Sequence, residues 1–98
     1  MGKWENKIEK YLREELEKIG GTCRKWVCPN HSGVPDQIVF FKGFICFVEA
    51  KTFDGELSSA QEREHVRLKE QGAEVFTLYS EHQVDVFVLG LKLREGIG

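Results

Sequence analysis

Two short apolar segments, residues 37–41 and 44–50, are separated by only two residues, Lys42-Gly43. So short a connection, with glycine as its second residue, predicts a tight turn and an antiparallel hairpin. With a two-residue turn, continuing the pairing outward places Asp36 opposite Glu49. A four-residue loop around the same turn keeps this register, whereas a three-residue loop breaks it.

The hairpin register has a chemical consequence. Because side chains alternate between the faces of a sheet, Asp36, Glu49 and Lys51 are predicted to share one face. Directly opposed carboxylates have Cβ atoms roughly 5 Å apart, which is unfavourable unless positive charge lies nearby. Lys51 supplies one such charge, and a divalent cation could supply the rest. Carboxylate oxygens and water are the ligands that suit magnesium.

A structural interpretation of the same residues is that Asp36 caps a turn while Glu49 and Lys51 form an edge salt bridge. Exposed ion pairs of that kind are common and contribute little to stability. Both segments, however, are apolar on both faces of the predicted strands, which is typical of central strands. We therefore favour the metal-binding interpretation.

The rest of the chain completes an αβββαβα order. The first three strands can form an antiparallel meander, and the fourth returns through a helix, which predicts a right-handed crossover to a parallel neighbour. The expected fold class is α/β, a small mixed sheet flanked by helices on both faces. Outside the hairpin, we expect a helix over 4–19 that ends at Gly20-Gly21, followed by a strand over 22–28. A second helix is expected from Ser58-Ser59 to about Gln71, with Gln61 at capping-box spacing, and then a strand over 74–79. The last element is expected to be a helix from Ser80 to about Arg94, although its valine pattern would also suit a strand.

Composition narrows the class of protein. The 98 residues are enough for one domain, 1–98, and the 41% hydrophobic and 31% charged fractions are those of a soluble globular protein. We find no apolar run of about 18 residues and no signal-like start, so we expect no membrane segment and a cytoplasmic location. A net charge of −2 argues against a protein that coats nucleic acid by bulk electrostatics. The three cysteines are interpreted as reduced thiols, since their spacing fits no usual zinc site.

At this point the motifs resemble a known family. Pro35-Asp36, a strand, and then Glu49-Ala50-Lys51 resemble the signature of the PD-(D/E)XK nuclease superfamily. The surrounding segments SGVPD (32–36), VEAK (48–51), LSSAQ (57–61) and Gly72-Ala73, with a first helix that ends in Gly-Gly, resemble the virus-type replication-repair nuclease (VRR-NUC) family from residue 8 to about 79. The resemblance implies a restriction-endonuclease-like core and metal-dependent hydrolysis of phosphodiester bonds.

The resemblance also implies roles for individual residues. Asp36 and Glu49 would bind Mg²⁺ or Mn²⁺, and the carbonyl of Ala50 could add a third oxygen. Lys51 would orient the attacking water or stabilise charge on the phosphate. Gln61 matches the helix glutamine that reaches toward the site in this family, although it has an equally good role as a capping residue.

The family also uses a glutamate from the first helix. Ile8-Glu9 with Leu12 and the Gly-Gly stop resembles that family pattern best, which implies Glu9, and its place at the edge of the apolar stripe gives modest support. Glu5 and Glu15 are alternatives. In the loop before Asp36, Gly33 is expected to let the chain pass close to a ligand.

A small nuclease without a recognition domain is expected to recognise DNA by shape. The resemblance implies a homodimer that acts on branched DNA, namely a Holliday-junction resolvase, encoded by a bacterium or phage and acting on intracellular DNA. Alternatives are a broader structure-specific or nicking nuclease for flaps or duplex, and a non-catalytic nucleic-acid-binding module.

The candidate phosphate contacts are Lys10, Arg13, Arg24, Lys25, Arg63 and Arg67. The last helix is expected to be apolar on more than one side, and this surface could form a dimer interface or belong to the core. Its apolar residues are Val84, Val86, Phe87, Val88, Leu89 and Leu91.

Overall fold

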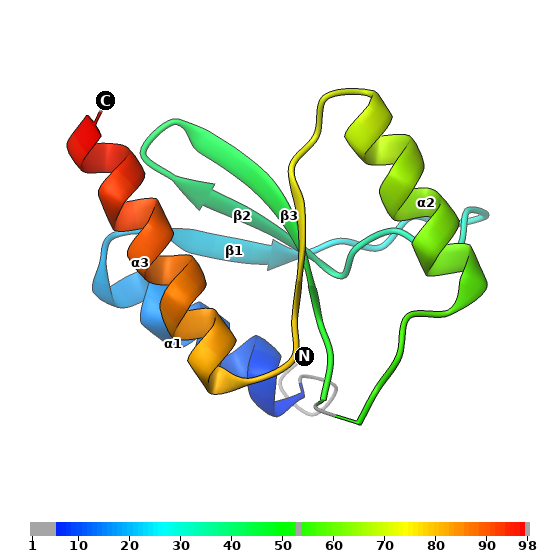
Figure 1. The fold of residues 1–98 in the computed structure, drawn as a ribbon, viewed down its shortest axis with the longest axis horizontal. Coiled ribbons are helices and arrows are strands. Elements are labelled where there is room, and N and C mark those ends of the chain that lie inside the picture. The colour runs from blue at the N-terminus through cyan, green and yellow to red at the C-terminus, as the bar shows by residue number, and fades with distance from the viewer. Residues whose placement is uncertain (1–5, 53, 98) are drawn as a thin grey trace.

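The computed structural model describes residues 6–52 and 54–97, with side chains through Glu95. It contains seven elements in the αβββαβα order predicted from the sequence (Figure 1). These are α1 (Lys7–Lys18), β1 (Thr22–Lys25), β2 (Gln37–Phe41), β3 (Phe44–Ala50), α2 (Ser59–Glu70), β4 (Val75–Leu78) and α3 (Glu81–Ile97).

The four strands form one mixed sheet in the order β1-β2-β3-β4. The first three are antiparallel, and β4 runs parallel to β3 after the crossover through α2. Phe41 pairs with Phe44, so the turn between β2 and β3 has two residues, as predicted. Both turn residues have positive φ, 46° at Lys42 and 87° at Gly43, which matches the twist of a tight hairpin.

The sheet has helices on both sides, but they cover it unequally. α1 and α3 pack together over one face, and α2 lies on the other side of the sheet, toward one end (Figure 1). The core lies between the sheet and the α1–α3 pair. Its largest fully buried side chains, all less than 2% exposed, are Leu12, Leu16, Val39, Val48, Val84 and Cys46, and Pro35 in the loop before β2 is equally buried.

Helix α1 is well defined at both ends by its own sequence. The Asn6 side chain accepts a hydrogen bond from the Glu9 amide at 2.8 Å, which caps the first turn. Buried residues at helical spacing, Ile8, Leu12 and Leu16, then face the core. At the other end Gly20 takes a φ of 87°, a conformation that glycine adopts without the clash of a Cβ atom.

Several predicted boundaries were wrong by a few residues. β1 ends at Lys25 rather than 28, because Trp26 still donates to the Asp36 carbonyl at 2.9 Å but Val27 turns outward and is 72% exposed. β4 is one residue shorter at each end than predicted, and α3 continues past Arg94. The last segment is a helix, not a strand, and Trp4 lies outside the described residues. In the described part of the chain, no helix is both long and apolar enough to cross a membrane.

Candidate active site

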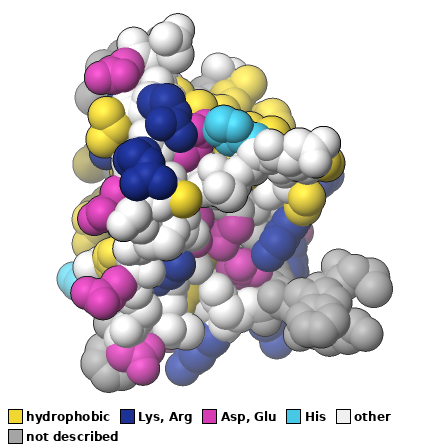
Figure 2. Space-filling model, turned by 90° about the vertical axis from the view of Figure 1, so that its right-hand side faces the viewer, with side chains coloured by type: hydrophobic (Ala, Val, Ile, Leu, Met, Phe, Trp, Pro, Cys, Tyr) yellow, Lys and Arg dark blue, Asp and Glu magenta, His cyan; other side chains and the backbone are white. Residues whose placement is uncertain are grey.

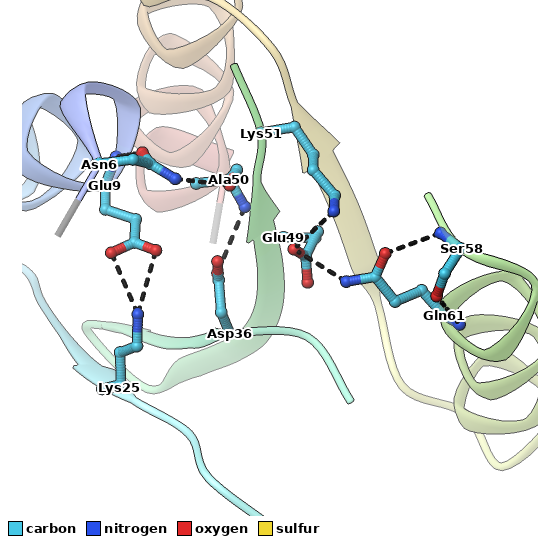
Figure 3. A network of polar contacts seen from close by, with 9 residues as sticks. All are labelled: Asn6, Glu9, Lys25, Asp36, Glu49, Ala50, Lys51, Ser58 and Gln61. Carbon is cyan, nitrogen blue, oxygen red and sulfur yellow. Dashed lines mark hydrogen bonds and ion pairs between the residues drawn. The ribbon is translucent and has the colours of Figure 1, made fainter. Parts of the chain in front are cut away.

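The predicted pair of carboxylates meets at the end of the hairpin (Figure 3). Asp36 immediately precedes β2 and Glu49 is the penultimate residue of β3. The pairing of Gln37 with Val48, carried one residue further, sets these two side by side. The amide of Ala50 donates to Asp36 Oδ1 at 3.2 Å, so Asp36 is bonded across to β3 rather than capping its own turn.

Glu49 is held in place through one oxygen only. It is 4% exposed, and its Oε2 accepts from Gln61 Nε2 at 3.2 Å. The same oxygen lies 3.8 Å from Lys51 Nζ, so Lys51 is on the predicted face. Glu49 Oε1 is buried and has no hydrogen-bond partner. A buried carboxylate oxygen without a partner is costly, so this atom is the strongest sign that the site suits a cation.

Gln61 fills both of the roles that its sequence position allowed. Its Oε1 accepts from the Ser58 amide at 2.9 Å, and its own amide donates to Ser58 Oγ at 3.1 Å, which is a complete capping box. With Oε1 committed to the cap, Nε2 is directed at Glu49. The start of α2 therefore fixes the orientation of a site carboxylate.

The first helix contributes Glu9, which is 4% exposed and lies beside Asp36 (Figure 3). Both of its carboxylate oxygens accept from Lys25 Nζ, at 3.2 and 3.1 Å. Of the two alternatives, Glu5 lies outside the described residues, and Glu15 forms an exposed ion pair with Lys18 on the last turns of α1. The geometry therefore favours Glu9.

Asp36 and Glu49 hold their protons more tightly than usual. Burial, the charge of Glu49 and the proximity of Glu9 raise the pKa of Asp36 to about 8. Burial also raises the pKa of Glu49, although the charge of Lys51 acts in the opposite direction. A divalent cation would favour the charged forms and reverse both shifts.

The residues present fit a Mg²⁺ or Mn²⁺ ion. Among the described residues, no three His, Cys, Asp or Glu side chains are gathered so as to hold a metal by themselves. Magnesium needs only one or two carboxylates, with water completing the shell. Asp36 and the unpartnered Oε1 of Glu49 supply these. The Ala50 carbonyl accepts from Asn6 Nδ2 at 3.0 Å and keeps a second lone pair.

Comparison with known proteins identifies the family of the chain. The chain is 44% identical over 78 residues to "Putative nuclease p44" of Acyrthosiphon pisum secondary endosymbiont phage 1, covering 79% of this chain and 84% of that protein. A solved structure described as a VRR_NUC domain superimposes with a TM-score of 0.78 at 38% identity, covering 86% of this chain and 92% of the other. The chain belongs to the VRR-NUC family. A scan against protein-family models found no match. The VRR-NUC fold predicted from the motifs is confirmed, and this VRR-NUC protein is a nuclease.

The six basic residues predicted to contact DNA are not equivalent in this VRR-NUC structure. Figure 2 shows acidic side chains near the middle of the α2 side of the molecule, with basic side chains to either side of them. Lys25 is committed to Glu9, and Arg67 pairs with Glu64 at 3.0 Å. Arg24 donates to Thr22 Oγ1 at 2.5 Å. Lys10 and Arg63 are exposed on α1 and α2, and Arg13 is half-buried on α1.

The loop before Asp36 packs against α2, which the sequence analysis missed. His31 Nε2 lies 2.8 Å from Glu64 Oε1, and Glu64 is only 6% exposed. Gly33, which was expected to let the chain pass close to a ligand, has a structural reason of its own. A Cβ atom at Gly33 would lie 2.4 Å from the carbonyl oxygen of Ala60, so this glycine allows close contact with α2. The contact joins the loop that carries Asp36 to the helix that carries Gln61.

Proposed function

We propose that this VRR-NUC nuclease is a Mg²⁺- or Mn²⁺-dependent endodeoxyribonuclease that hydrolyses phosphodiester bonds in branched DNA. We further propose that it acts as a homodimer on four-way (Holliday) junctions. The observation that carries the catalytic part is the pairing of the half-buried Asp36 with the buried Glu49, whose Oε1 has no partner and which has Lys51 alongside.

Each site residue then has a defined task. Asp36, Glu49 and the Ala50 carbonyl would hold the ion, which polarises a phosphate and lowers the pKa of a bound water when present. Lys51 is placed beside Glu49 to orient the attacking water or to stabilise charge that develops on the phosphate. Gln61 fixes one oxygen of Glu49 and so leaves the other turned toward the site. The buried carboxylate of Glu9 completes the acidic group.

The charge distribution supports recognition of DNA shape rather than sequence. The chain carries 16 acidic and 14 basic residues, so its attraction for phosphate must be local. Exposed or partly exposed basic residues on α1, β1 and α2 are the proposed backbone contacts, and such contacts position a duplex without reading its bases. They are Lys10, Arg13, Arg24, Arg63 and Arg67.

Helix α3 supports the homodimer. Its buried face is formed by Val84, Phe87, Val88 and Leu91, which assigns those residues to the core. The opposite face remains apolar and exposed, with Val86 56%, Leu89 52% and Leu93 60% accessible. Beside it, a groove of about 760 Å³ runs between α3 and β4, the edge strand of the sheet. A second copy would cover this surface, and a two-fold dimer would present two equivalent sites to the two equivalent strands of a junction.

The test is a cleavage assay on a labelled four-way junction, a flap and a linear duplex, with EDTA, Mg²⁺ or Mn²⁺. The wild-type protein should make paired, symmetric cuts in the junction with either ion and none with EDTA. Asp36→Asn should lower the cleavage rate by at least about a thousandfold and leave junction binding intact, since it removes a metal ligand and keeps the acceptor for the Ala50 amide. Asp54→Asn, which makes the same chemical change at an exposed site, is the matched control and should cut normally.

The other outcomes have distinct meanings. Cleavage of flaps or duplex at the same rate as the junction would keep the nuclease chemistry and overturn the junction preference. Full activity of Asp36→Asn would overturn the assignment of the metal site. Junction binding without cleavage under all conditions would leave a non-catalytic binding module.

A further inference from the structure

Lys25 occupies an unusual place for a surface lysine. It is the last residue of β1, one position before Trp26, whose amide donates to the carbonyl of Asp36 at 2.9 Å. From there its ammonium group reaches the Glu9 carboxylate and lies almost equally far from the two oxygens, at 3.2 and 3.1 Å. Glu9 itself is 4% exposed. The lysine therefore neutralises a buried carboxylate at the edge of the metal site instead of projecting toward DNA.

The carboxylates of the site form a row with a lysine at each end (Figure 3). Lys25 forms an ion pair with Glu9, and Lys51 Nζ lies 3.8 Å from Glu49 Oε2. Asp36 lies between the two glutamates. Asp36 lies beside Glu9 on one side (Figure 3) and accepts from the Ala50 amide on the other. In two-metal sites the two ions lie about 3.5–4 Å apart, and the Glu9–Asp36 pair beside the first ion would otherwise provide ligands for a second.

We propose that Lys25 takes the place of a second metal ion, so that this nuclease binds one divalent cation, at Asp36 and Glu49. Lys25 is a positioning residue: it holds Glu9 away from metal coordination, and its positive charge repels a second cation. The inference rests on the proposed metal-dependent function. It also explains why, among the described residues, no three carboxylates converge as a metal-binding group although Glu9 is close to Asp36.

The charges of the site agree with a single ion. With all three carboxylates ionised, the two lysines leave one negative charge unmatched. One divalent ion would bring the site to a net charge of +1, which is complementary to the single negative charge of a phosphodiester. Two ions would leave a strongly positive site, for which neither lysine would be needed.

The experiment is a calorimetric titration of the metal-free full-length chain with Mn²⁺, in the absence of DNA. The wild-type protein should bind one ion per chain and Lys25→Gln should bind two, because the Glu9–Asp36 pair becomes free. Glu9→Gln/Lys25→Gln should return to one ion, since the second carboxylate is also gone. Lys18→Gln is the matched control, because Lys18 also pairs with a glutamate of α1 but at an exposed position, and it should bind one ion.

Thermal unfolding gives a second readout that does not depend on activity. Lys25→Gln should have a lower Tm than the wild type in EDTA, because it leaves Glu9 buried without a counter-charge. Mn²⁺ should raise its Tm more than that of the wild type, because two ions bind the folded state. If the variant is unfolded in EDTA, Mn²⁺ should restore its fold.

Three results would overturn the proposal. They are two ions in the wild type, one ion in Lys25→Gln whatever its affinity, or a Lys25→Gln protein that Mn²⁺ does not stabilise more than the wild type. A wild-type protein that binds no Mn²⁺ would overturn the metal-dependent function as well. Normal Mn²⁺ binding without DNA cleavage would overturn the proposed function and leave the role of Lys25 standing.

Discussion

The two faces of the β2–β3 hairpin are built from alternate residues of the same strands, yet they differ in what covers them. On the face toward α1 and α3, Val39, Cys46 and Val48 are completely buried. On the face toward α2, Phe40 is 37% and Ile45 56% exposed. Asp36 and Glu49 lie at the end of this open face. The comparison indicates that one face supplies most of the stability, while the other is left accessible for chemistry.

Adjacent phenylalanines in β2 test this division most directly. Phe41→Ala should lower the free energy of unfolding by about 3–5 kcal/mol, because Phe41 is 3% exposed and its loss would leave a cavity under α1. Phe40→Ala should cost about 1 kcal/mol, since the side chain is already partly solvated. Urea unfolding of the metal-free proteins measures both. Equal losses would show that the open face toward α2 contributes as much to the free energy of unfolding as the face toward α1 and α3.

How much of this arrangement the sequence could predict depended on the distance along the chain. The Asp36–Glu49 register followed from a two-residue turn, which leaves little freedom in the pairing. The Lys25–Glu9 contact did not, because residues 26–36 separate β1 from β2 and so long a connection does not fix a register. Lys25 was therefore interpreted as a DNA contact. Only the structure shows that it faces α1.

The site also contains an interaction that a sequence signal could have revealed. Asn6 precedes a helix and stands three residues before Glu9, which is the spacing of an N-terminal cap. Its second hydrogen bond, from Nδ2 to the Ala50 carbonyl, joins residues 44 positions apart and had no local signal. Gln61 shows the opposite case, since its capping and site roles were both visible in the sequence and proved compatible.

The acidic site lowers the stability of the metal-free protein when Asp36 is ionised. The pKa of Asp36 is about 8 in the folded protein, above its value in the unfolded chain, so the folded state holds a proton that the unfolded state releases. The stability of the metal-free protein should therefore fall as pH rises from about 4 to 8. Asp36→Asn removes this ionisation and should be more stable than the wild type at pH 8 by on the order of 2 kcal/mol.

Urea unfolding in EDTA at pH 5 and pH 8 measures this effect. The advantage of Asp36→Asn should shrink at pH 5, because the wild-type carboxyl is then protonated in the folded state. Asp54→Asn, at an exposed position, should show no such dependence on pH. An advantage that is the same at both values would show that the substitution acts through packing and not through ionisation.

A smaller effect should separate the two roles of Gln61. Ser58→Ala removes the cap and should lower the free energy of unfolding by about 1 kcal/mol, while the cleavage rate stays within about twofold. Gln61→Ala also removes the donor to Glu49 and should lower the cleavage rate roughly tenfold, the order expected for a hydrogen bond to a charged group. Glu62→Ala, on the same turn but exposed, is the control. Parallel losses of rate and stability in both variants would show that Gln61 acts only as a cap.

The smallest effect on the folded monomer is expected on the outward face of α3, which is open like the site but apolar. Leu89→Glu should change the free energy of unfolding of the monomer by less than about 0.5 kcal/mol, since Leu89 is 52% exposed. In a dimer joined through α3, the same change would bury a charge and separate the two copies. Light scattering should therefore find a dimer for the wild type and 11.3 kDa for Leu89→Glu. Val66→Glu, 54% exposed on α2, should remain dimeric, and a dimer that survives Leu89→Glu would have to form through a different surface.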